Sequence, residues 1–194
     1  KIDFDRLFQI GVKEEFYRNG KIHIDNFEPR DGKKFEIKVG SLISHYFPNS
    51  HLSSVFLYIA KQLTLEEGRY GREMDHLMHI KKGGVNRLLI IECKAQEISI
   101  SEDKKSWIAK YKDGPKNIKH QLKMQAKAVL QMIKPLPEMN LEIHNIAVSS
   151  SSNSMPIKDE YAEQGTTVVL EVLNLLDFQD LLESYQKKDS EVSV

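Results

Sequence analysis

Three residues near the middle of this 194-residue chain have the types and spacing of a metal-binding acid pair with a neighbouring cation. The pattern predicts two strands joined by a turn at Gly83-Gly84, with Asp75 in the first strand and Glu92 and Lys94 at the end of the second. Residues two apart on a strand share a face, so Glu92 and Lys94 project together, and the hairpin brings Asp75 within reach of Glu92. Two converging carboxylates repel each other unless a cation neutralises them. Mg²⁺ or Mn²⁺, held by carboxylate oxygens and water, is the natural partner.

This arrangement is suited to hydrolysis of phosphodiester bonds. A divalent cation lowers the pKa of a bound water and stabilises charge on a scissile phosphate, while a lysine beside it orients the water or neutralises the transition state. The ordinary alternative is a salt-bridged strand end in contact with solvent, because such a pattern also occurs by chance. Motifs for other chemistries are missing, since the sequence contains no GxxxxGK[ST], GxGxxG, HExxH, GxSxG or paired CxxC.

Other reactive side chains nearby are expected to be structural. Cys93, the single cysteine, alternates to the opposite face of its apolar strand and is expected to be a buried thiol. His76 and His79 lie three residues apart, which places them on opposite faces, so we interpret them as surface or packing residues. Glu73 shares the face of Asp75, where a surface salt bridge is its expected role.

Hydrophobic periodicity outlines the elements that must position these residues. Strands are predicted at five places: 54–60, 73–80, 87–95, 143–149 and 166–172. Helices are predicted at four: 3–19, 35–47, 116–134 and 173–186. This order predicts one α/β domain with a mixed central sheet of about five strands flanked by helices. It comprises an N-terminal helical extension over 1–34, a core over 35–186 and a frayed tail over 187–194.

Composition restricts the class of protein. Lysine plus arginine total 28, as do aspartate plus glutamate, so the net charge is zero. One cysteine, 10 glycines and 6 prolines exclude a disulfide scaffold and a low-complexity chain. No apolar run approaches the ~18 residues of a membrane span, and no secretory signal is visible. We therefore expect a cytoplasmic protein that does not engage membranes.

Lysines are concentrated between residues 110 and 127, where there are six lysines and one acid. The ordinary interpretation is a solvated helix surface. Four of them recur on one side of the predicted helix: Lys116, Lys119, Lys123 and Lys127. They span about 16 Å at ~1.5 Å per residue, so the row can follow a phosphate backbone without reading bases. Trp107 precedes this helix and is expected to close the core rather than stack on a base.

A longer pattern unites these features. The stretch GREMDHLMHIKKGGVNRLLIIECKAQ resembles the core of the PD-(D/E)xK nuclease superfamily, which has the restriction-endonuclease-like fold, and within it the nuclease-related domain family, NERD. The resemblance covers about residues 35–134. The first-helix segment is matched by Glu36, Val39 and Ile43, and the family's E-x-D-H segment by Glu73 to His76. The Gly turn is Gly83-Gly84, and the strand ending I-E-x-K is Ile91 to Lys94. The family's Trp is Trp107, and the start of its next helix is matched by Asn117 and Gln121. The family's glycine before the helix acid is Phe35 here, and two of its prolines are Met74 and Ile118.

The resemblance implies a role for each matching residue. Asp75 and Glu92 would hold Mg²⁺ or Mn²⁺, and Lys94 would be the catalytic lysine. Glu36 would be a supporting acid from the first helix; its alternative is an exposed acid in a first helical turn, which the helix dipole favours. Gln121 would face the site from the long helix; its alternative is a solvent-facing residue.

The leading hypothesis is therefore a Mg²⁺-dependent nuclease that hydrolyses phosphodiester bonds of DNA, as an endonuclease, with RNA as an alternative substrate. The competing hypothesis is a non-catalytic nucleic-acid-binding or scaffolding domain of a larger DNA-processing or defence protein. The resemblance also implies a helicase-like or other defence partner domain, and a homodimer that would cut both strands.

Overall fold

The computed structural model describes residues 31–48, 51–59, 70–133 and 135–187. Its helical elements are α2 (Asp31–Tyr46), α3 (Ile118–Ile133), the 3₁₀ turn η1 (Pro137–Met139) and α4 (Leu175–Gln186). Its strands are β1 (His51–Ile59), β2 (Tyr70–Lys82), β3 (Val85–Lys94), β4 (Ile98–Ile100), β5 (Trp107–Tyr111), β6 (Gly114–Asn117), β7 (Leu141–Ser149), β8 (Ile157–Glu163) and β9 (Thr166–Asn174). The predicted helix over 3–19 and the tail from residue 188 lie outside the described residues.

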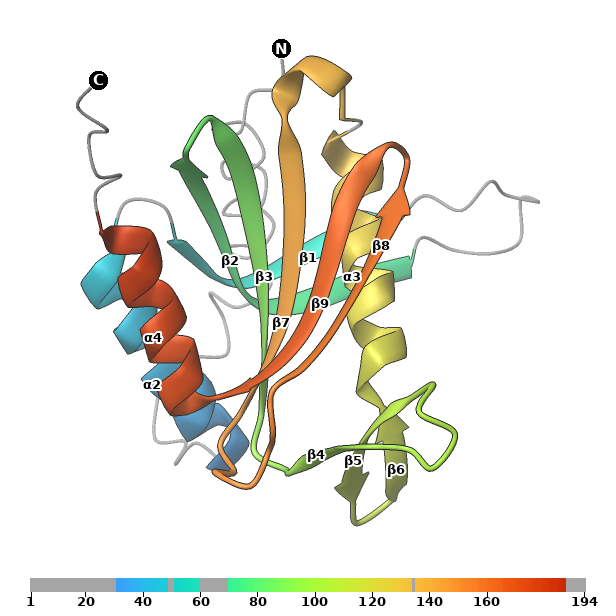
Figure 1. The fold of residues 1–194 in the computed structure, drawn as a ribbon. Coiled ribbons are helices and arrows are strands. Elements are labelled where there is room, and N and C mark those ends of the chain that lie inside the picture. Colours follow the sequence, from blue (N-terminus) through green and yellow to red (C-terminus); the bar gives the residue numbers. More distant parts are fainter. Residues whose placement is uncertain (1–30, 49–50, 60–69, 134, 188–194) are drawn as a thin grey trace.

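Six strands form one mixed sheet in the order β1-β2-β3-β7-β9-β8 (Figure 1). β3, β7 and β9 are mutually parallel, and the other neighbours are antiparallel. The α/β class and the mixed central sheet are therefore as predicted. The additional strand is β8, at the edge of the sheet. Its partly buried residues Ile157 and Tyr161 are separated by three charged residues, and such a charged edge strand lacks a strong apolar signal.

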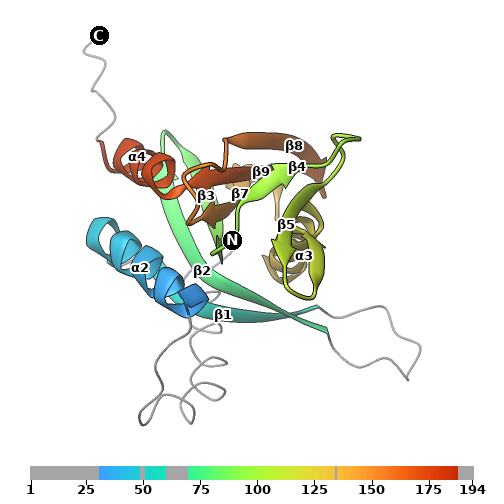
Figure 2. The ribbon, with the colours of Figure 1, turned by 90° about the horizontal axis from the view of Figure 1, so that it is seen from below.

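Helices cover both faces of this sheet. α2 and α4 lie side by side on one face and α3 lies on the other (Figures 1 and 2). The middle of β3 serves both layers: Leu88 and Ile90 pack toward α3, and Leu89 and Ile91 pack toward α2 and α4. Burial on both faces explains the continuous apolar run of this strand. No helix in the described part of the chain is long and apolar enough to cross a bilayer.

A small antiparallel sheet, β4-β5-β6, connects β3 to α3. Trp107, at the start of β5, is 2% exposed and belongs to the core under α3, as predicted. The predicted start of the long helix at Lys116 is wrong, because Lys116 lies in β6 and α3 begins at Ile118. The cause is Asn117, whose Oδ1 accepts a hydrogen bond from the backbone N–H of His120 and caps the helix.

Candidate active site

The strands β2 and β3 separate where the two predicted acids lie. Their ladder ends with the pair His76–Ile91. Beyond it, β2 continues beside β1, and β3 continues beside β7. Asp75 and Glu92 are the next residues on the two strands, so both lie at the fork. Oδ2 of Asp75 accepts a 2.6 Å hydrogen bond from the backbone N–H of Cys93, which ties β2 to β3 at this point.

Glu92 is the more deeply buried of the two acids at the fork, with 7% of its surface exposed. Its Oε1 accepts hydrogen bonds from Lys94 Nζ at 2.6 Å and from Gln121 Nε2 at 2.7 Å. Its Oε2 accepts one from Gln125 Nε2, also at 2.7 Å. Charge-assisted bonds of this kind are among the stronger ones in proteins. The structure thus brings together the strand lysine and the helix glutamine that the sequence singled out.

Asp75 is half-buried and lies near two other acids. Burial, followed by the charges of Glu92 and Glu36, raises the pKa of Asp75 to about 8, although the Cys93 N–H and the Lys94 ammonium act in the opposite direction. In the metal-free protein this carboxyl therefore binds a proton at pH values where an ordinary aspartate is ionised. A perturbed acid beside a second acid is typical of sites built for a cation or for proton transfer.

Lys94 and Cys93 are adjacent on β3 and point to opposite faces, so their side chains have different surroundings. Burial lowers the pKa of Lys94, but the charge and hydrogen bond of Glu92 outweigh it, and the net shift is upward. Lys94 is therefore an ammonium at neutral pH, suited to donating hydrogen bonds and offsetting negative charge. Burial, and then nearby acids, raise the pKa of the Cys93 thiol. Cys93 packs against the α2–α4 layer, as expected of a structural thiol, but it is half-buried rather than buried as predicted.

Glu36 approaches the site from α2. Its side chain is 16% exposed and forms an ion pair with Lys33, one turn earlier. It lies in the second helical turn, so the alternative of an exposed first-turn acid does not describe it. Its backbone carbonyl lies 3.1 Å from Nε2 of His76, next to Asp75, and its charge is one of the lesser causes of the raised pKa of Asp75.

Gln125 is a residue of the site that the sequence analysis did not identify. It is fully buried, and its Nε2 donates to Oε2 of Glu92 and, at 3.0 Å, to the carbonyl of Glu73. Its Oε1 accepts a 3.2 Å hydrogen bond from Asn145 Nδ2, which fixes the orientation of the amide. The available signal is its spacing, since it lies one turn after Gln121 on the same helix face. Glu73 contributes its carbonyl, and its side chain is exposed.

The four predicted DNA-contacting lysines do not form one free row. Lys119 makes a 2.7 Å ion pair with Asp159 and is 16% exposed. Lys116 belongs to the β5–β6 hairpin, with its ammonium 4.5 Å from the centre of the Tyr111 ring. Lys123 and Lys127 are exposed on α3. The interrupted row has a structural cause, because β8 supplies Asp159 to Lys119 and also the ring of Tyr161, whose centre lies 5.3 Å from the Lys123 ammonium.

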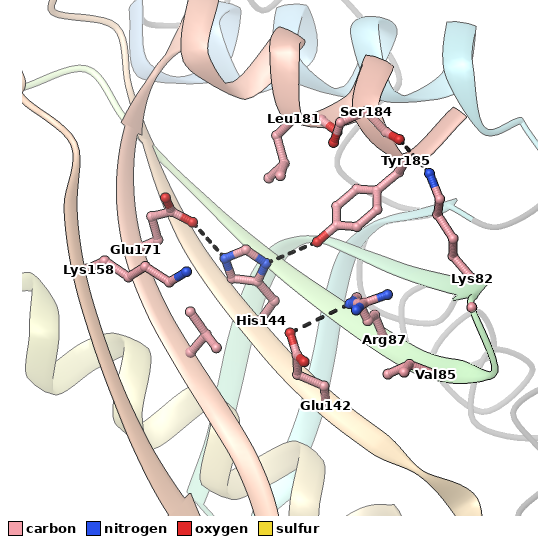
Figure 3. A pocket seen from close by; sticks show the side chains of 12 residues that line it. Lys82, Val85, Arg87, Glu142, His144, Lys158, Glu171, Leu181, Ser184 and Tyr185 are labelled. Carbon is pink, nitrogen blue, oxygen red and sulfur yellow. Dashed lines mark hydrogen bonds and ion pairs between the residues drawn. The ribbon is translucent and has the colours of Figure 1, made fainter. Parts of the chain in front are cut away.

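A polar hollow of about 620 Å³ lies elsewhere, between α4 and the sheet (Figure 3). Odd-numbered β3 residues such as Arg87 face it, so it opens on the opposite face from Glu92. Four of its side chains form two pairs: Arg87 lies 3.6 Å from Glu142, and His144 lies 2.7 Å from Glu171. None of the residues that the sequence analysis singled out for catalysis lines this hollow.

The fold and the fork together define an α/β domain with an acid pair and a lysine where two central strands part. Residues 31–150 match the family model of the nuclease-related domain, NERD, and the chain belongs to this family. The matched segment runs from α2 to the end of β7 and includes every residue described at the fork. The resemblance read from the sequence is thereby confirmed. A search of curated proteins gave no match to this chain.

Proposed function

We propose that this protein is a metal-dependent nuclease that hydrolyses phosphodiester bonds of DNA, cutting internally, with Asp75 and Glu92 holding Mg²⁺ and Lys94 assisting the attacking water. The observation that carries the proposal is the convergence of these three side chains at the fork between β2 and β3. Membership of the nuclease-related family supports a role in nucleic-acid hydrolysis.

The donor set suits a hard divalent cation. Among the described residues, no group of three or more His, Cys, Asp or Glu side chains is arranged to hold a metal ion by itself. A cation at the fork would therefore have two carboxylate ligands and would need water for the rest. Two carboxylates, with water completing the shell, are what Mg²⁺ typically takes from a protein. Burial, and then the charges of Glu92 and Glu36, raise the pKa of Asp75, and a bound cation would offset those charges. Glu92 is already oriented by Gln121 and Gln125, as ligands are when neighbouring groups fix them.

Each side chain has a distinct part in the proposed reaction. When bound, the cation lowers the pKa of water and offsets charge on the phosphate. The Lys94 ammonium would donate to the attacking water or to the phosphate oxygens, where negative charge develops. Its raised pKa makes it a poor general base at neutral pH. Gln121 and Gln125 hold Glu92, so that the carboxylate needs little reorganisation during the reaction.

The decisive experiment combines cleavage and binding. Purified protein is incubated with supercoiled plasmid, single-stranded DNA and RNA in Mn²⁺, Mg²⁺ or chelator. We expect metal-dependent cleavage of DNA that Asp75→Ala and Lys94→Ala abolish. Matched controls are Asp180→Ala on α4 and Lys158→Ala on β8, both exposed, which retain cleavage. No cleavage beyond that of Asp75→Ala, with binding retained, would favour the non-catalytic binding domain; cleavage of RNA alone would change the substrate.

A further inference from the structure

We infer that His76 is a positioning residue: together with His51 it clamps α2 to the sheet and thereby holds Glu36 toward Asp75. The inference rests on the proposed function, because it concerns the same site.

The clamp is a chain of hydrogen bonds in which the donor and acceptor at each step can be assigned. The backbone carbonyl of Glu36 can only accept, so Nε2 of His76, 3.1 Å away, carries a proton. Nδ1 of His76 is then an acceptor, and Nε2 of His51 donates to it at 2.9 Å. Nδ1 of His51 in turn accepts from the hydroxyl of Ser44 at 3.0 Å. Both rings are neutral in this arrangement, in agreement with the burial that lowers each pKa to about 4.

Both ends of this chain lie on the same helix. Glu36 and Ser44 are eight residues apart on α2, about 12 Å at ~1.5 Å per residue. The two imidazoles between them come from β1 and β2. Two attachment points restrict both the position of α2 and its rotation about its own axis, which a single contact would not do.

Gly40 makes the approach of the ring possible. A glycine in a helix interior is unfavourable relative to alanine, so its presence calls for a packing reason. A Cβ atom at this position would lie 2.7 Å from Cε1 of His76, closer than atoms can approach. The missing side chain thus lets the imidazole rest directly on the backbone of α2, one turn after Glu36.

The clamp is connected to the candidate active site because His76 and Asp75 are neighbours on β2. Asp75 and His76 are adjacent on β2, so their side chains point to opposite sides of the strand. His76 contacts α2, while Asp75 contacts β3. The backbone carbonyl of Glu36 lies 3.1 Å from the ring of His76, the neighbour of Asp75 in the chain, so Glu36 is close enough for its charge to act on Asp75. A shift of α2 would therefore change the separation of Glu36 and Asp75 without altering either side chain.

Mn²⁺ binding, measured by calorimetry without nucleic acid, tests this role in the full chain. We expect His76→Ala and Glu36→Gln each to weaken binding about tenfold. The double variant should bind no more weakly than the weaker single one, because His76 acts through Glu36. Additive losses, or wild-type affinity in His76→Ala, would overturn the inference. His45→Ala, exposed on the same helix, is the matched control and should bind normally.

Two further variants separate positioning from general destabilisation. His76→Gln keeps an N–H for the Glu36 carbonyl and should recover part of the affinity. Gly40→Ala leaves every polar group in place, favours the helix and displaces the ring, so it should weaken Mn²⁺ binding without unfolding the protein. Wild-type affinity in Gly40→Ala would contradict the clamp.

A metal-independent measurement keeps the test separate from the proposed function. Hydrogen–deuterium exchange of the α2 amides should accelerate at least tenfold in His76→Ala relative to those of α4. Unchanged exchange would overturn the clamp. If wild-type protein binds no Mn²⁺, the metal site fails as proposed, and the exchange result alone decides whether His76 holds α2.

Discussion

The backbone N–H of Cys93 donates a 2.6 Å hydrogen bond to Oδ2 of Asp75, one residue beyond the last β2–β3 pair. Through this bond Asp75 is fixed to the strand that carries Glu92 and Lys94. The proposed site is therefore built on strands that the core holds, and sites on such elements are more precise than sites on loops.

Replacing Asp75 with asparagine should stabilise the metal-free protein at high pH. Burial and two neighbouring acids raise the pKa of Asp75 from 3.8 to about 8, so the folded state favours the protonated form. The resulting stability is fully present below about pH 4, declines as the pH rises and is lost above about pH 8. Asparagine mimics the neutral carboxyl at every pH. In chelator, we expect Asp75→Asn to melt at least ~3 °C above wild type at pH 8.5 and near wild type at pH 4.

Thermal melts across this pH range check the prediction. The difference between the two proteins isolates Asp75, since all other groups titrate in both. A difference that does not change with pH would show that Asp75 has an ordinary pKa in the folded protein.

Gln125 should matter more to stability than Gln121. Gln125→Ala leaves the buried carboxylate of Glu92, the carbonyl of Glu73 and the amide of Asn145 each short of a partner. We expect a loss of about 3 kcal/mol in the free energy of unfolding by urea. Gln121 is partly exposed and has its described bond to Glu92 alone to lose, so Gln121→Ala should cost about 1 kcal/mol. Equal losses in the two variants would contradict the buried role of Gln125.

Trp107 should act as a core residue. It is 2% exposed, so Trp107→Ala should lower the free energy of unfolding by about 3–5 kcal/mol, and Trp107→Phe by less. Urea unfolding followed by circular dichroism measures both. If Trp107 instead stacked on a base, Trp107→Ala would keep its stability and lose affinity for single-stranded DNA.

The lysines of α3 should contribute unequally to DNA binding. Lys123 and Lys127 are exposed, so each alanine variant should reduce the salt dependence of binding by about 0.9 in log K against log [salt]. Lys119 is already paired with Asp159, so Lys119→Ala should reduce the slope by less than half of this. Fluorescence anisotropy with a duplex oligonucleotide in chelator measures the slopes, with Lys158→Ala as control. Equal reductions at all three positions would show that the ion pair opens on binding.

The elements that the sequence revealed are those with dense apolar periodicity. β3 and α3 were predictable because burial on one or both faces imposes a run or a stripe of apolar residues. β8 and the small sheet β4-β5-β6 were not, since they are short or lie at an edge and carry many polar residues. The interpretation of His76 as an ordinary surface or packing residue was incomplete, because its partners Ser44, His51 and Glu36 lie far from it in the chain.

The sequence by itself indicated the class of domain through hydrophobic periodicity, and the family through the resemblance of its motifs. It also singled out Asp75, Glu92 and Lys94 as the candidate site, because strand alternation and a hairpin relate these positions locally. Only the tertiary structure decided how they meet: the fork between β2 and β3, the support of Glu92 by Gln125, and the engagement of Lys119 by Asp159. These relations depend on which strands stay paired and which helices pack against them. Which strands pair and which helices pack is decided by the apolar surface buried over the whole core, and the spacing of residues along the chain does not contain this information.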